Sequence, residues 1–239
     1  MFDGKLKAVT FSYDDAVTQD IRFIQLLDKY NLKGTFNINS ERLGKENTLI
    51  REGVTVNHNK VPADKVKEIY KNHEVAVHTL THPNLKGVGD DNEVIRQVEQ
   101  DRINLENLVG YNVQGMAYPC GGDCYDKRVI RLIRENTGIK YARTTNSNHK
   151  FDIQTNLLDF SPSVHHMDFD KMFELGEEFI NLKPDSPKIY YIWGHTYEFD
   201  IANTWDKIEE FLKMISGRDD IFYGTNEEVL LGAVSNCRK

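Results

Sequence analysis

The sequence predicts an α/β fold built on a parallel sheet. Strand-like and helix-like segments alternate seven times along the 239 residues, and a helical crossover between successive strands makes those strands parallel. Either a doubly wound sheet or a closed barrel fits this alternation. Four groups of candidate catalytic residues follow the carboxyl ends of predicted strands, and in a barrel those ends share one rim. The shared rim therefore favours the barrel.

The first half of the chain carries three predicted strands. Their apolar and β-branched runs cover residues 6–11, 34–39 and 74–78. Apolar side chains recur at helical spacing over residues 20–30, and Pro62 suits the first turn of a second helix that ends near residue 72. The polar residues 41–61 are expected to form an inserted loop or hairpin.

The second half carries four predicted strands, over residues 113–118, 140–145, 188–193 and 221–223. The predicted helices cover residues 92–108, 126–137, 168–181 and 203–216. Gly110 and Gly138 end the first two of these helices. Thr225 and Glu228 have the spacing of a capping box, which predicts one more helix. Residues 146–167 are expected to be irregular, and no linker divides the chain, so a single domain over residues 1–239 is expected.

The composition excludes several classes of function. A net charge of −7 without a Lys/Arg cluster argues against a nucleic-acid partner. No apolar run reaches membrane-spanning length, and no basic-then-apolar leader opens the sequence, so no membrane partner is expected. These features predict a cytoplasmic protein, with a trimmed secreted form as the alternative. Cys120, Cys124 and Cys237 are too few for a disulfide framework.

Two histidines and two aspartates form the strongest chemical pattern. His78 ends a predicted buried strand and His82 follows four residues later, a spacing that lets two imidazoles converge on one divalent cation. Asp14 and Asp15 follow the first predicted strand. Two histidines and one carboxylate leave a metal an open position for water or substrate, and the second carboxylate is then free to act as a base. His195, at the exit of another strand, can supply the acid for the leaving group.

These motifs resemble the polysaccharide deacetylases, the NodB homology domain of carbohydrate esterase family 4. Ser12-Tyr13-Asp14-Asp15 resembles the first family motif, His78-Thr79-Leu80-Thr81-His82 the second, and Trp193-Gly194-His195 the last. The motifs occur in the family's order over most of the chain. The resemblance implies a distorted (β/α)7 barrel that removes N-acetyl groups from an amino sugar, an oligosaccharide or a polysaccharide.

The resemblance also implies a role for each motif residue. Asp14 would be the catalytic base and His195 the general acid. Asp15, His78 and His82 would hold a divalent metal, usually zinc, with cobalt or nickel as substitutes. The metal and a backbone N–H would stabilise the oxyanion of the substrate.

The chain departs from the third and fourth family motifs. Ala117-Tyr118-Pro119-Cys120-Gly121 stands at the third motif, without its arginine and with cysteine in place of its aromatic residue. The Cys120 backbone N–H can still serve as the oxyanion donor, and Arg143 is the expected substitute for the arginine that orients the base. For the fourth motif, whose carboxylate tethers the acid histidine, Asp159 is the predicted equivalent.

Other readings stay open. His165 and His166 are expected in a loop, while His58, His73 and His149 are expected at the surface. A barrel hydrolase acting on a non-sugar amide, such as a cyclic imide or ureide, is an alternative enzyme. A carbohydrate-binding relative without turnover is an alternative of a different class, although it would need neither a base nor an acid.

Overall fold

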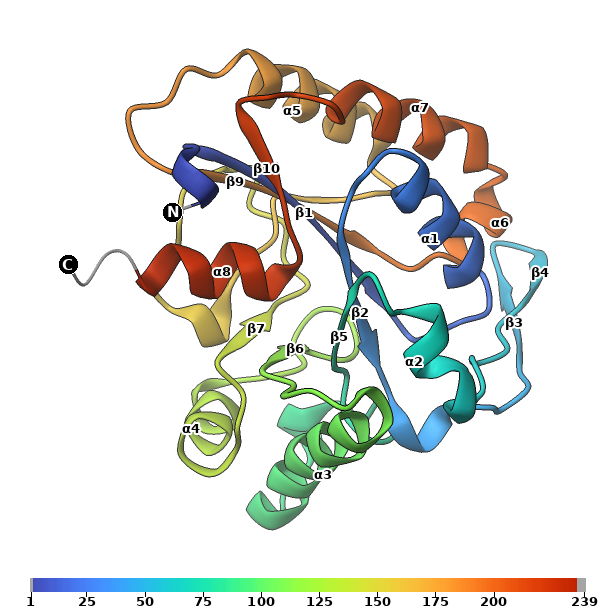
Figure 1. The fold of residues 1–239 in the computed structure, drawn as a ribbon. Helices are drawn as coiled ribbons and strands as arrows, with labels where there is room; N and C mark the ends of the chain where they lie inside the picture. The colour runs from blue at the N-terminus through green and yellow to red at the C-terminus, as the bar shows by residue number, and fades with distance from the viewer. Residues whose placement is uncertain (1, 236–239) are drawn as a thin grey trace.

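The core of the protein is a strongly curled parallel sheet (Figure 1). The computed structural model describes residues 2–235. The sheet has the order β7-β6-β5-β2-β1-β9-β8, with β10 beside β1. Its strands are β1 (Lys7–Asp14), β2 (Gly34–Ile38), β5 (Glu74–Val77), β6 (Gly115–Ala117), β7 (Tyr141–Arg143), β8 (Val164–His165), β9 (Lys188–Gly194) and β10 (Ile221–Tyr223). The predicted α/β fold with a parallel sheet is confirmed.

Strand β1 lies at the centre of the sheet. Along one side it pairs with β9, and along the other its first half pairs with β10 and its second half with β2. All eight of its residues are buried. A strand enclosed in this way must be almost wholly apolar or have its polar groups paired, which explains the run from Ala8 to Phe11.

The segment from Phe160 to the short strand β8 brings the two edges of the sheet together. The Phe160 carbonyl accepts from the Thr144 N–H, and the Ser163 N–H donates to the Tyr191 carbonyl, so this segment lies between β7 and β9. The sheet is thereby strongly curled into a distorted, incompletely closed barrel. The prediction of an irregular stretch over residues 146–167 is wrong at this point, because two residues are too few for a strand pattern to show in the sequence.

Helices surround the sheet (Figure 1). They are α1 (Asp20–Lys29), α2 (Val66–Ile69), α3 (Asp91–Val109), α4 (Lys127–Asn136), α5 (Phe169–Asn181), α6 (Glu198–Ala202), α7 (Trp205–Ile215) and α8 (Asn226–Ser235). Gly110 ends α3 in the left-handed conformation, at φ 83°. Thr225 and Glu228 exchange both bonds of the predicted capping box, at 2.8 and 3.3 Å. Within residues 2–235, no helix has the length and apolar character that crossing a membrane requires.

The predicted insertion contains a hairpin. Strands β3 (Thr48–Arg51) and β4 (Val54–Asn57) pair antiparallel and lie beside α6 (Figure 1). The chain then returns to the barrel, where Lys60 forms an antiparallel bridge with Val17, just after β1. The hairpin therefore delivers the residues that follow it to the carboxyl end of the central strand.

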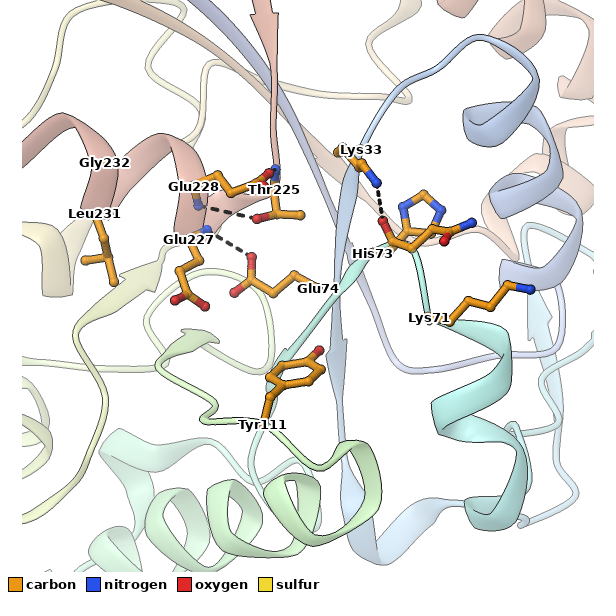
Figure 2. Close-up of a pocket in the computed structure, with 11 residues that line it drawn as sticks. Lys33, Lys71, His73, Glu74, Tyr111, Thr225, Glu227, Glu228, Leu231 and Gly232 are labelled. Carbon is orange, nitrogen blue, oxygen red and sulfur yellow. Dashed lines mark hydrogen bonds between the residues drawn. The ribbon is translucent and has the colours of Figure 1, made fainter. Parts of the chain in front are cut away.

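A cavity of about 540 Å³ lies at the other end of the barrel, where β2 and β5 begin (Figure 2). Its buried carboxyl group is Glu74, which accepts from the Thr35 hydroxyl at 2.7 Å, the Glu227 N–H at 2.9 Å and the Tyr141 hydroxyl. Lys33 donates to the Asn72 carbonyl at 2.8 Å. These polar groups are hydrogen-bonded within the protein. We therefore interpret the cavity as part of the structure that closes this end of the barrel, and not as a ligand site.

Replacing Glu74 with glutamine should flatten the pH dependence of stability. Burial raises the pKa of Glu74 to about 7, so the folded chain binds this proton more tightly than the unfolded chain does. The stabilisation is complete below about pH 4.3 and is lost as the pH rises through about 7. Urea unfolding at about pH 5 and about pH 8 measures the difference. The exposed Glu46→Gln control should keep the wild-type slope, and an unchanged slope in Glu74→Gln would contradict the assignment.

Candidate metal centre and active site

The predicted site residues converge at the carboxyl ends of the strands. Asp14 ends β1 and Asp15 follows it, while His78 and His195 come directly after β5 and β9. A cavity of about 520 Å³ opens between them. The predicted residues that line it are Asp14, Asp15, His78, His82, Cys120 and His195. Arg143 lies buried beneath this cavity at the end of β7.

Asp15, His78 and His82 form a triad suited to a metal ion. One ligand atom from each lies within 4.8 Å of the others, and Asp15 Oδ1 is 3.9 Å from His82 Nε2. His78 Nδ1 is 2.9 Å from the Ala117 carbonyl, so that nitrogen carries the proton. His78 Nε2 is buried and has no hydrogen-bond partner among the described residues. A lone pair held in this way is what a divalent cation requires.

The charges of the triad also fit a cation. Burial lowers the pKa of His78 to about 4 and also lowers that of His82, so both imidazoles are neutral at neutral pH. Burial alone would raise the pKa of Asp15, but its contact with His58 and the charge of Lys60 hold that pKa well below its ordinary value. The triad thus offers one carboxylate and two neutral imidazoles.

The rim backbone adopts left-handed conformations at several residues that are not glycine. The φ angles are 85° at Asp15, 67° at Thr79, 63° at His82 and 65° at Cys120. Such conformations are uncommon for residues with a Cβ and rarest for β-branched ones such as Thr79. They turn the chain sharply after β1, β5 and β6, which keeps the ligand-bearing residues at the rim.

Asp14 is held by two buried partners. Its Oδ1 accepts from Asn37 Nδ2 at 2.8 Å, and its Oδ2 pairs with the Arg143 guanidinium. Burial raises the pKa of Asp14, but the charge of Arg143, with smaller effects from His78 and His195, lowers it overall. Arg143 also lies over the Trp193 ring, 4.3 Å from its centroid. The arginine therefore contacts the predicted base.

His195 is bound by the Glu198 carboxylate, which no sequence motif assigned to the site. Glu198 Oε2 accepts from the His195 N–H at 3.1 Å and lies 3.2 Å from His195 Nδ1. Burial lowers the pKa of His195, but Glu198, with smaller effects from Asp14 and Asp15, outweighs burial and raises the pKa to about 9. The proposed tether Asp159 instead accepts from the Tyr125 hydroxyl at 2.7 Å. A glutamate three residues after the histidine was the available signal.

Glu198 also contacts residues outside the predicted site, among them His166, which was expected in a loop. His166 Nε2 lies 3.0 Å from its Oε2, and Arg51 Nη1 donates to its Oε1 at 3.1 Å. His165 lies in β8, and His166 is buried directly after it, rather than in an irregular loop. His58 and His73 are also buried, contrary to the surface location expected for them, whereas His149 is exposed.

Cys120 lies beside the triad. Its N–H donates to His82 Nε2 at 3.5 Å, and its Sγ is 3.7 Å from His82 Nδ1. Burial raises the pKa of its thiol, which disfavours the thiolate that a nucleophile needs. Cys120 and Cys124 are free thiols, and Cys237 lies outside the described residues.

The substitution Glu198→Gln should lower the pKa of His195. The variant removes the Glu198 charge, the largest of the effects that raise this pKa, and leaves burial opposed only by the smaller effects of Asp14 and Asp15. NMR titration of the His195 ring should then give a midpoint clearly below that of wild type. The control Asp200→Asn changes a carboxylate on the same helix that bonds to Gln19 and Trp205, so its His195 midpoint should match wild type. A midpoint that stays near 9 in Glu198→Gln would refute the assignment.

Solved structures of low sequence identity share the fold. A protein from Mycobacterium smegmatis with an inferred polysaccharide deacetylase assignment has a TM-score of 0.70 at 16% identity, over 98% of this chain and 92% of that chain. A variant of peptidoglycan deacetylase PdaC from Bacillus subtilis has a TM-score of 0.56 at 14% identity, over 98% and 94%. A family 4 pseudoenzyme from Bacillus anthracis has a TM-score of 0.53 at 17% identity, over 95% of this chain and 66% of its own.

The sequence itself identifies the family. No curated protein matches the chain. The family profile described as polysaccharide deacetylase matches residues 3–142, which is more than half of the chain. A His/Asp triad for metal binding, typical of these enzymes, lies at the rim of the barrel. The chain therefore belongs to the polysaccharide deacetylase family, carbohydrate esterase family 4.

Proposed function

We propose that the protein is a metal-dependent hydrolase that removes N-acetyl groups from an amino sugar or its oligomer. The observation that carries this proposal is His78 Nε2, which has no hydrogen-bond partner within residues 2–235 and faces Asp15 and His82 beside a second, ionised carboxylate. A site with a metal-ligating triad and a separate base is suited to hydrolysis of an amide. Zinc is the proposed ion because it favours imidazole and carboxylate ligands, with cobalt or nickel as substitutes.

Each residue then has a defined task. A divalent ion bound by Asp15, His78 and His82 would polarise the acetamide carbonyl and lower the pKa of water. Asp14 is ionised at neutral pH and takes a proton from the attacking water. Arg143 and Asn37 fix the orientation of Asp14 because they bond to different oxygens of its carboxylate.

Protonation of the leaving amine is assigned to His195. Its raised pKa keeps the ring protonated at neutral pH, and its Nε2 lies 3.9 Å from Asp14 Oδ2, so the acid and the base border one space. The Cys120 N–H, on the same rim, is the proposed donor to the oxyanion of the substrate. This role needs no side chain, so the replacement of the family's aromatic residue by cysteine does not remove it.

A binding protein without turnover is the second candidate. The missing third-motif arginine favours it, and the related fold from Bacillus anthracis is described as a pseudoenzyme. Arg143 weighs against it. Its guanidinium reaches Asp14 from β7, instead of from the third motif after β6, and so replaces the missing arginine. Hydrolysis of another amide, such as a cyclic imide or ureide, would use the same residues.

Zinc-loaded protein is expected to release acetate from N-acetylglucosamine oligomers. His78→Ala should abolish the release because the triad loses its buried ligand atom, while the exposed His149→Ala should leave it unchanged. A coupled acetate assay measures both. Acetate release by His78→Ala at the wild-type rate would contradict the metal site. No release by wild type with one zinc bound would reject this substrate class.

Arg143→Ala is expected to lower kcat by about 10²-fold, because the base loses the group that orients it. Arg143→Lys keeps a charge but not the planar fork of the guanidinium, so its kcat should lie between those of the alanine variant and wild type. Steady-state kinetics with zinc-loaded protein tests this, with the exposed Arg131→Ala as the control. An unchanged kcat in folded Arg143→Ala would exclude the proposed role.

A further inference from the structure

A lysine ammonium lies next to the metal-ligating carboxylate. Lys60 Nζ is 3.5 Å from Asp15 Oδ1, and its side chain is 4% exposed. The other carboxylate oxygen of Asp15 is 3.4 Å from His58 Nε2. Lys60 does not line the catalytic cavity, so it approaches Asp15 from the protein side. No role in the proposed reaction accounts for a buried cation at this position.

The backbone holds Lys60 in this place. The Thr18 N–H donates to the Asn59 carbonyl, and the Val61 N–H donates to the Ala16 carbonyl, both at 2.9 Å. These bonds flank the bridge between Lys60 and Val17. The segment after the β3–β4 hairpin is therefore joined to the residues that follow Asp15, and the ammonium is delivered to the carboxylate by fixed structure.

Asp15 is the carboxylate that compensates this buried charge. Asp20 also lies near Lys60, but it accepts from the Thr196 hydroxyl at 2.6 Å and the Tyr70 hydroxyl at 2.8 Å. Burial raises the pKa of Asp20 to about 7, which weakens it as a counter-ion. Arg42 adds further positive charge near Lys60. A buried ammonium without a partner is strongly unfavourable, so Lys60 and Asp15 stabilise each other in the metal-free chain.

We propose that Lys60 is an internal counter-cation of Asp15 that sets the affinity of the triad for its metal. Lys60 keeps the metal-free carboxylate in place and lowers metal affinity, because it repels a second cation bound to the same group. The physical basis is that like charges a few ångströms apart repel strongly in a buried site. The inference rests on the metal triad of the proposed function and is independent of the substrate.

The proposal is tested by measuring the zinc affinity of variants in which an uncharged residue replaces Lys60. Zinc would be titrated into metal-free wild type, Lys60→Met and Lys60→Gln against a competing fluorescent chelator. Both variants should bind zinc at least about tenfold more tightly than wild type, and their metal-free forms should melt at lower temperature. Lys60→Arg keeps the charge and should stay near wild type in affinity. The exposed Lys45→Met removes a charge elsewhere and should bind zinc as wild type does.

The opposite results overturn the proposal. Folded Lys60→Met and Lys60→Gln that bind zinc as wild type does, or more weakly, would show that the ammonium has no such effect. If Lys60 only held the local structure in place, its replacement would disturb the triad, and the variants would bind zinc more weakly than wild type. Variants that fold only with zinc would support the proposal, because the metal then replaces the missing charge, whereas failure to fold even with zinc would refute it. Acetate release is measured separately, so tighter zinc binding without turnover would reject only the proposed reaction.

Discussion

The structure is constrained by two adjacent carboxylates buried at the end of its central strand. Asp14 is 1% exposed and Asp15 is 7% exposed, so each needs a partner within the protein. Arg143, from β7, compensates Asp14, and Lys60, from the segment after the β3–β4 hairpin, compensates Asp15. Both partners follow β1 in the sequence, and they come from segments far apart along the chain. Neutralising the two aspartates therefore depends on long-range contacts with these two segments.

Local patterns were enough to predict most of the fold. The seven predicted strands are all present, because β-branched and apolar runs such as the one before His78 are visible in the sequence alone. The helix limits at Gly110 and Thr225 were also predictable, since capping depends on residues close in sequence. The convergence of His78 and His82 with Asp15 follows from the same logic: parallel strands that end at one rim bring their exits together.

The remaining features depend on contacts that no local pattern encodes. The two residues of β8 are recognised only from their bonding to β9. His58 looked like a surface histidine because its sequence neighbours are polar, yet the hairpin turns it against Asp15. Glu198 could not be assigned from the sequence, because its role depends on the histidines that surround it. Apart from the pairing of Arg143 with Asp14, which the sequence did predict, the charge pairs around the site are its least predictable part.

The left-handed residues at the rim have a consequence for how this protein tolerates change. Asp15, Thr79, His82 and Cys120 all adopt conformations that glycine would adopt more easily. Selection for heat resistance alone would favour substitutions that relieve the backbone strain at these turns. Turns without that strain would no longer direct the metal ligands toward one point. The rim is therefore where thermal robustness and a well-ordered site oppose each other. Engineering for robustness is better directed at the outer helices, which carry no site residue apart from Glu198 in α6.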